Sequence, residues 1–280
     1  MKASIFKKNI NYMKKGILYS ILAVAMVHSS FAQSHRFSKK PIWQDEFNRD
    51  GLLDSTKWSY DTGGHGWGNH ELQFYTKARP ENCRIESGNL VIEARKEAHG
   101  SNTFTSARVV TKGKFDFTYG RVEVRAKLPE GRGTWPAIWM LASQISYGSN
   151  FWPDQGEIDI MEHVGFDPGV IHGTVHTKAF NHVIGTQKGD TISVRDFSSK
   201  FHVYRMDWTP ESIQIFVDET PYFQFKNTGK SWQEWPFNKP EHLILNIAMG
   251  GDWGGQKGVD EKITSAKMLV DWVRVYKYEL

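Results

Sequence analysis

The sequence predicts an all-β protein built as a two-sheet antiparallel sandwich. Runs of residues that are β-branched, or that alternate apolar with polar side chains, recur along most of the chain, and both patterns are typical of strands. Glycine, proline, asparagine and aspartate separate these runs at short intervals, as turns require. The sequence contains no convincing long amphipathic helix, which favours a sandwich over an α/β fold.

Each expected strand is identified by its own pattern, in chain order. Residues 89–94 place leucine, valine and isoleucine in succession, which suits a buried strand. Residues 120–126 alternate apolar with charged residues, so one face of this strand should be buried and the other exposed to solvent. The next four runs repeat one or the other pattern and comprise residues 201–206, 213–217, 243–247 and 268–278.

The first 32 residues have the pattern of a secretory signal peptide. Five lysines precede an apolar run over residues 16–27, and the small residues Ser30 and Ala32 follow it, which predicts cleavage after Ala32. The apolar run is shorter than the roughly 20 residues that a membrane span needs. We therefore expect a secreted or periplasmic protein with no membrane contact after cleavage, translated from Met1 or from Met13.

Removal of this leader brings the chain close to neutrality. The leader holds five of the 35 basic residues and no acid, so 30 basic residues remain against 31 acidic ones. A near-neutral protein gives no support for a nucleic-acid or polyanion partner. Cys83 is the only cysteine, which excludes an internal disulfide. The remaining length suits a short polar lead-in over residues 33–40 and one large domain over residues 41–280.

Three acids cluster within an apolar, strand-like run, where carboxylates are rare unless they are paired, hydrogen-bonded or bound to a metal. Glu157 and Asp159 are two residues apart, so their side chains should share one face of a strand. Strict alternation would send Glu162 to the opposite face. A β-bulge at Ile160 and Met161 would offset the register by one residue and turn all three acids toward one cleft.

This grouping of acids suits the cleavage of a glycosidic bond. Retaining glycosidases place two carboxyl groups roughly 5–5.5 Å apart, one to attack the anomeric carbon and one to protonate the leaving oxygen. Asp159 could hydrogen-bond the nucleophile and separate the charges, so that Glu157 stays ionised and Glu162 stays protonated near neutral pH. The alternatives are a solvated strand face with three unrelated acids and a calcium site.

Tryptophans in glycine-rich segments form a second group of candidates. Trp67, Trp135, Trp139 and Trp253 lie in such segments, and glycine lets a loop bend tightly and approach a ligand closely. Exposed aromatic faces suit the C–H faces of sugar rings, although Trp67 and Trp253 could equally pack within loops. Tryptophans in strand-like runs are expected in the core instead: Trp43, Trp58, Trp208 and Trp272.

Other motifs do not complete a site. His70 and Glu71 begin like the zinc motif H-E-x-x-H, but Phe74 stands at the second histidine position, which rejects a zinc protease. His172 and His176 would share a strand face, yet their spacing offers no cysteine or acidic partner, so a substrate contact or a place in the core is expected. The sequence has no P-loop and no G-x-S-x-G elbow.

Beyond these patterns, the chain resembles glycoside hydrolase family 16, and most closely its bacterial laminarinases, which are endo-1,3-β-glucanases. The resemblance extends from about residue 43 to residue 278 and includes Trp-Gln-Asp-Glu-Phe at the start and Asp-Trp-Val-Arg-Val-Tyr near the end. The segments that carry it are residues 43–47, 68–75, 119–121, 133–139, 156–162, 173–176, 243–251 and 271–276.

The resemblance implies a β-jelly-roll sandwich with a concave, sugar-binding sheet. It implies a retaining reaction with Glu157 as nucleophile, Asp159 as its hydrogen-bonding partner and Glu162 as acid/base. The spacing E-x-D-x-x-E, which Met161 lengthens, looks like the laminarinase, agarase and carrageenase branches, whereas lichenases usually have E-x-D-x-E. The implied substrate-contacting residues are Trp135, Trp139, Asn69, Arg108 and His176, to which the glycine-rich context adds Trp253.

The resemblance also implies a structural calcium ion, which family members often hold on the convex side. Glu46, Gly88 and Asp271 stand at the matching positions, with main-chain oxygens as further ligands, and oxygen ligands suit Ca²⁺. No cofactor is expected for catalysis.

The expected function is that of a secreted, monomeric endo-β-glucanase that cuts internal β-1,3 bonds of laminarin-type glucan, with mixed-linkage β-1,3-1,4-glucan as a further substrate. The expected partner is therefore a β-glucan polysaccharide or oligosaccharide. One alternative is a galactanase of the agarase or carrageenase type, although the tryptophans have no dense basic cluster beside them to recognise sulfate. Another alternative is a non-catalytic β-glucan-binding protein, although such relatives lose one or both glutamates.

Overall fold

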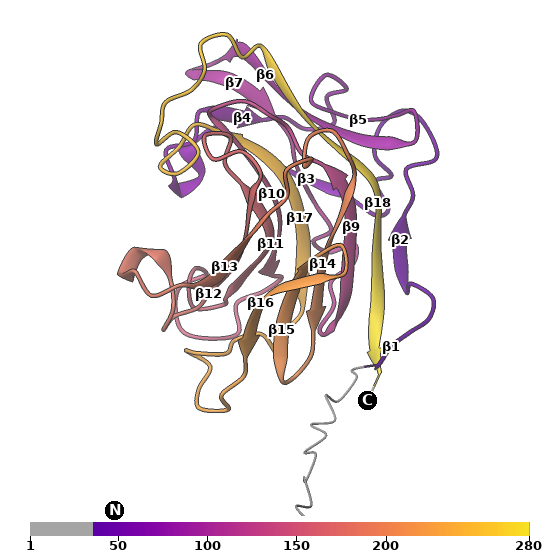
Figure 1. Ribbon diagram of the computed structural model, residues 1–280, viewed down its shortest axis with the longest axis vertical. Helices are drawn as coiled ribbons and strands as arrows, with labels where there is room; N and C mark the ends of the chain where they lie inside the picture. The colour runs from indigo at the N-terminus through magenta and orange to yellow at the C-terminus, as the bar shows by residue number, and fades with distance from the viewer. Residues whose placement is uncertain (1–35, 280) are drawn as a thin grey trace, which may run out of the picture. The chain divides into compact units, whose positions relative to one another are not determined.

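The computed structural model describes residues 36–279, which form two packed β-sheets (Figure 1). The expected leader, its cleavage site and residues 33–35 lie outside the described residues. Within the described part, every ladder is antiparallel except the short pairing of β4 (Gln73–Tyr75) with β7 (Asn102–Ser106). The prediction of an all-β, two-sheet antiparallel sandwich is confirmed.

The smaller sheet has the strand order β13-β12-β11-β10-β17-β8-β3. It is curved, and its hollow side faces away from the other sheet (Figure 1). Its strands are β3 (Ser59–Asp61), β8 (Arg108–Val110), β10 (Thr134–Ala142), β11 (Glu157–His163), β12 (Val170–His176), β13 (Lys188–Ser193) and β17 (Glu241–Met249).

The larger sheet has the strand order β16-β15-β14-β9-β18-β6-β7-β4, with β1 and β2 paired to β18 and β5 paired to β6. Besides β4 and β7, its strands are β1 (Arg36–Phe37), β2 (Trp43–Asp45), β5 (Cys83–Glu86), β6 (Asn89–His99), β9 (Gly120–Lys127), β14 (His202–Trp208), β15 (Ser212–Val217), β16 (Thr220–Lys226) and β18 (Ser265–Glu279).

All six runs expected to be strands are strands, namely β6, β9, β14, β15, β17 and β18. In β9, buried and partly exposed residues alternate from Gly120 to Lys127, because one face packs on the core and the other meets solvent. In β17, every residue is buried, including the polar Glu241, His242 and Asn246, because the strand lies in the middle of its sheet between β10 and β8. The alternation in β9 therefore predicts burial as well as strand type.

The hydrophobic core lies between the two sheets and is rich in aromatic side chains. Trp58 is 1% exposed and Trp208 is fully buried, which confirms both as core residues. Trp43 is half-buried and stacks on Phe115 at 5.2 Å between ring centroids. The Trp58 indole N–H donates to the Asp45 carboxylate at 2.9 Å, so its one polar atom is satisfied inside the core.

The expectation that Trp272 is a core residue is wrong. The ladder between β18 and β9 pairs Val270 with Ala126 and Trp272 with Arg125, so Asp271 is an extra residue in β18. Such a bulge reverses the alternation of side chains beyond it. Trp272 is therefore half-buried on the outer face, beneath the Arg274 guanidinium at 4.0 Å from its ring centroid.

Cys83 is fully buried at the start of β5. Burial raises the pKa of its thiol to about 12, so the group is an inert part of the core rather than a reactive thiol. Among residues 36–279, no helix has the length and apolar character needed to cross a membrane.

Candidate active site

The predicted bulge in β11 is present. The ladder with β12 pairs Asp159 with Thr174 and Glu162 with His172, so two residues of β11 face the single intervening Gly173. On the other side, β10 pairs with Asp159 and with Met161 and passes over Ile160. The extra residue restores the cleft-facing direction at Glu162, and all three acids line one cleft.

This cleft lies on the hollow side of the curved sheet and has a volume of about 490 Å³. Trp135 and Trp139 from β10 line it together with Asn69 and Arg108, so four of the six expected substrate-contacting residues lie beside the acids. His176 and Trp253 do not line the cleft directly but contact residues that do. The residues implied by the resemblance that line the cleft therefore come from four separate segments of the chain.

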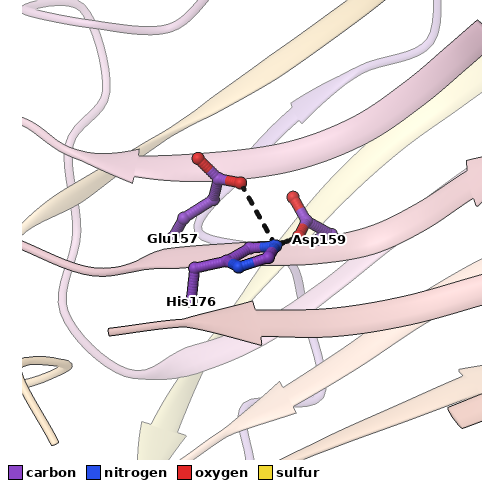
Figure 2. Close-up of side chains that lie close together, drawn as sticks. All are labelled: Glu157, Asp159 and His176. Carbon is purple, nitrogen blue, oxygen red and sulfur yellow. Dashed lines mark ion pairs between the residues drawn. The ribbon is translucent and has the colours of Figure 1, made fainter. Parts of the chain in front are cut away.

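His176 lies opposite Glu157 in the β11–β12 ladder, and its side chain lies near both Glu157 and Asp159. Figure 2 shows its imidazole beside the carboxylates of Glu157 and Asp159. The Nε2 atom is 3.8 Å from Oε1 of Glu157 and 3.4 Å from Oδ2 of Asp159. Because His176 is only 7% exposed, it acts in a region of low dielectric constant, where a charge on the imidazole stabilises nearby carboxylates strongly.

Burial raises the pKa of Glu157, Asp159 and Glu162, each to about 8. For Glu157 and Glu162, the nearby Asp159 carboxylate raises the pKa further. Three adjacent negative charges are costly in such a place, so the cluster retains protons near neutral pH.

The neighbours of the two glutamates are similar but not the same. His176 and Arg108 lower the pKa of Glu157, whereas Asp159 and Glu162 raise it. Glu162 accepts a hydrogen bond from the Trp135 indole N–H at 2.9 Å; this bond and His176 lower the pKa of Glu162, whereas Asp159 and Glu71 raise it. The difference that favours an ionised Glu157 and a protonated Glu162 is therefore Arg108 beside the first and Glu71 beside the second.

Trp135 is held in place by a small aromatic cluster. The Trp253 ring meets it edge-on at 5.4 Å between centroids, and Trp253 meets His172 in the same manner at 4.9 Å. Edge-to-face contacts of this kind fix the orientation of a ring. Trp253 therefore supports Trp135, whose N–H reaches Glu162, and His172 belongs to this cluster rather than to a metal site.

Arg108 is clamped between two tryptophans at the other side of the cleft. Its guanidinium carbon lies 4.7 Å from the Trp67 ring centroid and 4.6 Å from that of Trp139. Its Nε donates to the Asp61 carboxylate at 3.0 Å. The cation covers one face of each indole, so this group offers a fixed positive charge held between two aromatic rings.

A polar network that sequence reasoning missed lies beneath this side of the cleft. The Trp139 N–H donates to Asn246 at 2.7 Å, and the Asn246 amide donates to the Tyr75 hydroxyl at 3.0 Å. Glu71 accepts hydrogen bonds from Asn69 at 3.2 Å and from Gln73 at 2.6 Å. The network fixes both predicted residues, Trp139 through Asn246 on β17 and Asn69 through Glu71, which itself bonds to Gln73 on β4.

Two signals in the sequence could have indicated this network. Asn69, Glu71, Gln73 and Tyr75 alternate at the strand period, so their polar groups share one face. Asn246 is a polar residue in the middle of an apolar run, which calls for a buried partner.

The opposite wall of the cleft was not predicted either. It comprises Phe151 and Trp152 from the β10–β11 loop and His182 and Val183 from the short 3₁₀ helix His182–Ile184. The His182 ring lies 5.0 Å from Trp152 and 5.2 Å from His176 between centroids. These loops carry no periodic pattern, and only the folded chain brings their aromatic rings together.

The residues implied for calcium lie on the larger sheet, at the end of β2, in the β5–β6 turn and on β18. The Glu46 carboxylate accepts two hydrogen bonds from Arg274, both of 2.8 Å, and the Asp271 carboxylate accepts one from Arg125. Gly88 adopts a positive φ of 75°. Both carboxylates are held by guanidinium groups, so the side-chain part of the expected ligand set does not fit an ion as it stands, and calcium stays a prediction.

The rejected zinc motif has another role in the structure. The His70 side chain is 86% exposed and pairs with Asp252 at 2.9 Å. Glu71 points instead into the cleft, where it lines the wall beside Asn69. The two residues of the motif therefore face different surroundings.

Buried, paired carboxylates in an aromatic cleft are typical of enzymes that cleave glycosidic bonds. The class of protein that the fold and the site define is therefore a glycoside hydrolase. The family model "Glycosyl hydrolases family 16" matches residues 70–274. The chain belongs to this family, which confirms the resemblance found in the sequence.

Known relatives agree with this assignment. The chain is 54% identical over 268 residues to a protein named Beta-glucanase from Rhodothermus marinus, covering 92% of this chain and 94% of that protein. The X-ray structure of the laminarinase from Rhodothermus marinus aligns with a TM-score of 0.85 at 55% identity, covering 89% of this chain and 100% of that one. A non-specific endo-beta-1,3(4)-glucanase, co-crystallised with 1,3-beta-D-cellotriosyl-glucose, aligns with a TM-score of 0.82 at 50% identity, covering 87% and 97%.

Proposed function

We propose that this protein is a secreted endo-β-glucanase that hydrolyses internal β-1,3 bonds of laminarin-type glucan, and mixed-linkage β-1,3-1,4-glucan as a further substrate. The observation that carries the proposal is the bulged strand β11, which presents Glu157, Asp159 and Glu162 to one cleft. The names of similar proteins, a laminarinase and an endo-beta-1,3(4)-glucanase, supply the substrate class.

The reaction proceeds by double displacement with retention of configuration. Ionised Glu157 attacks the anomeric carbon while Glu162 donates its proton to the leaving oxygen, which gives a covalent glycosyl-enzyme. Glu162 then removes a proton from water, which attacks the same carbon and releases Glu157. Asp159 and His176 hold the Glu157 carboxylate in position, and the Trp135 N–H orients Glu162.

A panel of polysaccharides tests the substrate class. The exported protein is incubated with laminarin, lichenan, agarose and carrageenan, and the products are sized over time. We expect medium-length oligosaccharides from laminarin early in the reaction, as cleavage at internal bonds requires, and slower release from lichenan. Reducing ends from agarose but not from laminarin would overturn the substrate assignment.

Azide rescue tests the assignment of the nucleophile. In a Glu157→Ala variant, azide should enter the vacated space and give a glycosyl azide of inverted configuration, because only one displacement then occurs. The matched variant Glu162→Ala lacks the acid/base group but keeps the nucleophile, so its azide product should retain the configuration. The same product configuration from both variants would contradict the two roles.

The galactanase alternative is weaker because the cleft offers little to a sulfated chain. Arg108 is the one lysine or arginine among the described residues that line the cleft, and it is already paired with Asp61 and covered by two indoles. A sulfate-recognising cleft would need free basic groups beside the aromatic rings. The agarose and carrageenan arms of the panel decide between the two substrates.

A further inference from the structure

The bulge in β11 leaves one residue without a partner residue in either neighbouring strand. Ile160 has no partner residue in the ladder with β10 or in the ladder with β12, and its side chain is fully buried. The extra residue of a bulge is left unpaired and the ladder is locally disrupted. The direction of Glu162 depends on how this stretch of backbone is held.

A second bulge faces the first from the other sheet. The ladder between β15 and β16 pairs Ile215 with Phe223 and Phe216 with Pro221, so Tyr222 is the extra residue in β16. Regular alternation with the buried Phe223 would turn Tyr222 outward, but the bulge re-aims it, and its ring packs against the core. Strand β16 packs on β12 and β13, which brings the ring below β11.

The hydroxyl of Tyr222 reaches the main chain of the first bulge. Its Oη donates to the Ile160 carbonyl oxygen at 3.4 Å, which is longer than the roughly 2.5–3.0 Å of an ordinary O–H···O bond. The contact is therefore a weak hydrogen bond, which can constrain the position of the carbonyl but adds little energy. Gly173, which faces the bulge from β12, leaves the space for this contact. A Cβ atom at Gly173 would lie 2.7 Å from the Tyr222 hydroxyl oxygen and 3.1 Å from two of its ring carbons.

We propose that Tyr222 is a positioning residue, which holds the β11 bulge from the opposite sheet through the Ile160 carbonyl and so keeps Glu162 directed into the cleft. Gly173 is its counterpart, because only glycine admits the hydroxyl at this place. The proposal rests on the proposed function, in which Glu162 donates the proton to the leaving oxygen.

The charge state of Tyr222 suits this role. Burial raises the pKa of its hydroxyl well above the ordinary value, and the carboxyl groups of Glu162 and Asp159 raise it further. The hydroxyl therefore keeps its proton and stays a donor throughout the pH range in which the protein would act.

The test uses the fact that an acid is needed only by a poor leaving group. A 2,4-dinitrophenolate leaves without a proton, whereas a sugar hydroxyl or a simple phenol requires one. The value of kcat/KM for aryl β-laminaribiosides reports the first displacement alone. Misdirection of Glu162 should therefore lower kcat/KM for the phenyl glycoside and leave the dinitrophenyl glycoside nearly unchanged.

Two variants alter the contact from opposite sides. Tyr222→Phe removes the hydroxyl and keeps the ring, and Gly173→Ala pushes on the hydroxyl. For each variant we expect kcat/KM on the phenyl glycoside and on laminarin to fall about tenfold, which is part of the roughly 10²–10⁴-fold that general acid catalysis supplies. On the dinitrophenyl glycoside we expect kcat/KM to change less than about twofold. The double variant should lose less than the product of the two single losses, because both act through one contact.

Tyr204→Phe is the matched control, since the Tyr204 hydroxyl is also buried in the larger sheet but has no hydrogen-bond partner within residues 36–279. For Tyr204→Phe we expect no dependence of kcat/KM on the leaving group. In Tyr222→Phe, an equal loss of kcat/KM on both glycosides, or no loss on either, would overturn the positioning role. If Tyr222→Phe does not fold, Gly173→Ala decides by the same criterion. Failure of the unaltered protein to cleave either glycoside would instead refute the proposed function.

Discussion

At the scale of single residues, the site depends on carboxyl groups that are expensive to bury. Glu157, Asp159 and Glu162 were recognisable in the sequence because acids in an apolar strand need a reason. Their neighbours were harder to recognise, since Glu71 bonds locally to Asn69 and Gln73 and Asn246 bonds across strands to Trp139 and Tyr75. The cluster of acids was therefore predictable, whereas the groups that hold the cleft were mostly not predicted.

Replacement of Glu157 by glutamine should remove nearly all turnover while the fold persists. The variant keeps the shape of the side chain but has no nucleophilic oxygen, so we expect kcat on laminarin to fall about a thousandfold or more. Steady-state kinetics measures the loss, with circular dichroism to verify folding. Glu219→Gln, at a side chain that is 92% exposed, is the control and should retain full activity; comparable losses in both variants would contradict the role of Glu157.

The raised pKa values also predict how stability depends on pH. A carboxyl group with a pKa of about 8 in the folded chain, against an ordinary value near 4.5, stabilises the folded state below pH 4.5, and this contribution is lost as pH rises toward 8. Glu162→Gln removes one such group while its amide oxygen can still accept the Trp135 N–H. We therefore expect the variant to gain about 1–2 kcal/mol in free energy of unfolding relative to the unaltered protein between about pH 5 and pH 8.

Thermal unfolding at the two pH values measures this effect. The measured quantity is the Tm of the variant minus the Tm of the unaltered protein. A gain of this size should make this difference about 3 °C or more larger at about pH 8 than at about pH 5. The exposed control Glu219→Gln should show the same difference at both pH values. A gain for Glu162→Gln that is larger at low pH would have the wrong sign and would refute a raised pKa.

At the scale of secondary structure, bulges decide where side chains point. The bulge in β11 was predictable because chemistry demanded that Glu162 join the other acids. The bulges at Tyr222 and Asp271 were not. Strand β16 is short, and in β18 Trp272 continues the apolar alternation of Met268 and Val270 and so hides the extra residue. The mistaken burial of Trp272 has the same origin, because one extra residue moves every later side chain to the opposite face.

The proposed calcium ion belongs to this scale, since it would join β2, the β5–β6 turn and β18. Saturating calcium, at about 100 times its Kd, would stabilise the folded state by about 2.7 kcal/mol. Because Arg274 and Arg125 occupy the two carboxylates, the main-chain oxygens of this region would have to hold the ion. We then expect a chelator to lower the Tm by several degrees and added calcium to restore it, with little change in kcat. A Tm that changes with neither the chelator nor added calcium would mean that no ion binds here, and that Arg274 and Arg125 alone hold the Glu46 and Asp271 carboxylates.

At the scale of the whole chain, the strand order gathers residues that are far apart in sequence. Arg108, the acids of β11 and Asn246 come together because β11, β10, β17 and β8 are neighbours in one sheet. The apolar pattern predicted the strands and the two-sheet class, but it holds no information on which strands pair. The family resemblance added a jelly-roll sandwich with a concave sheet, but the order of strands was not predicted.

Export is a further prediction for the whole chain, and we propose that cleavage follows Ala32. Expression of the full chain in a bacterial host, followed by mass spectrometry of the exported product, should give a mature protein that begins at Gln33. Size-exclusion chromatography of this product should give the mass of a monomer. A product that keeps its first residues and stays in the cytoplasm would refute the leader assignment.

The burial of Cys83 has a practical consequence for watching the enzyme work. Because the only thiol in the chain is inaccessible and has a pKa of about 12, thiol-reactive dyes should leave the native protein unlabelled. A Val183→Cys variant would place one reactive thiol at a position that is 71% exposed on the rim of the cleft. A dye attached there would report the arrival and departure of a glucan chain in real time, with no other labelled site to confuse the signal.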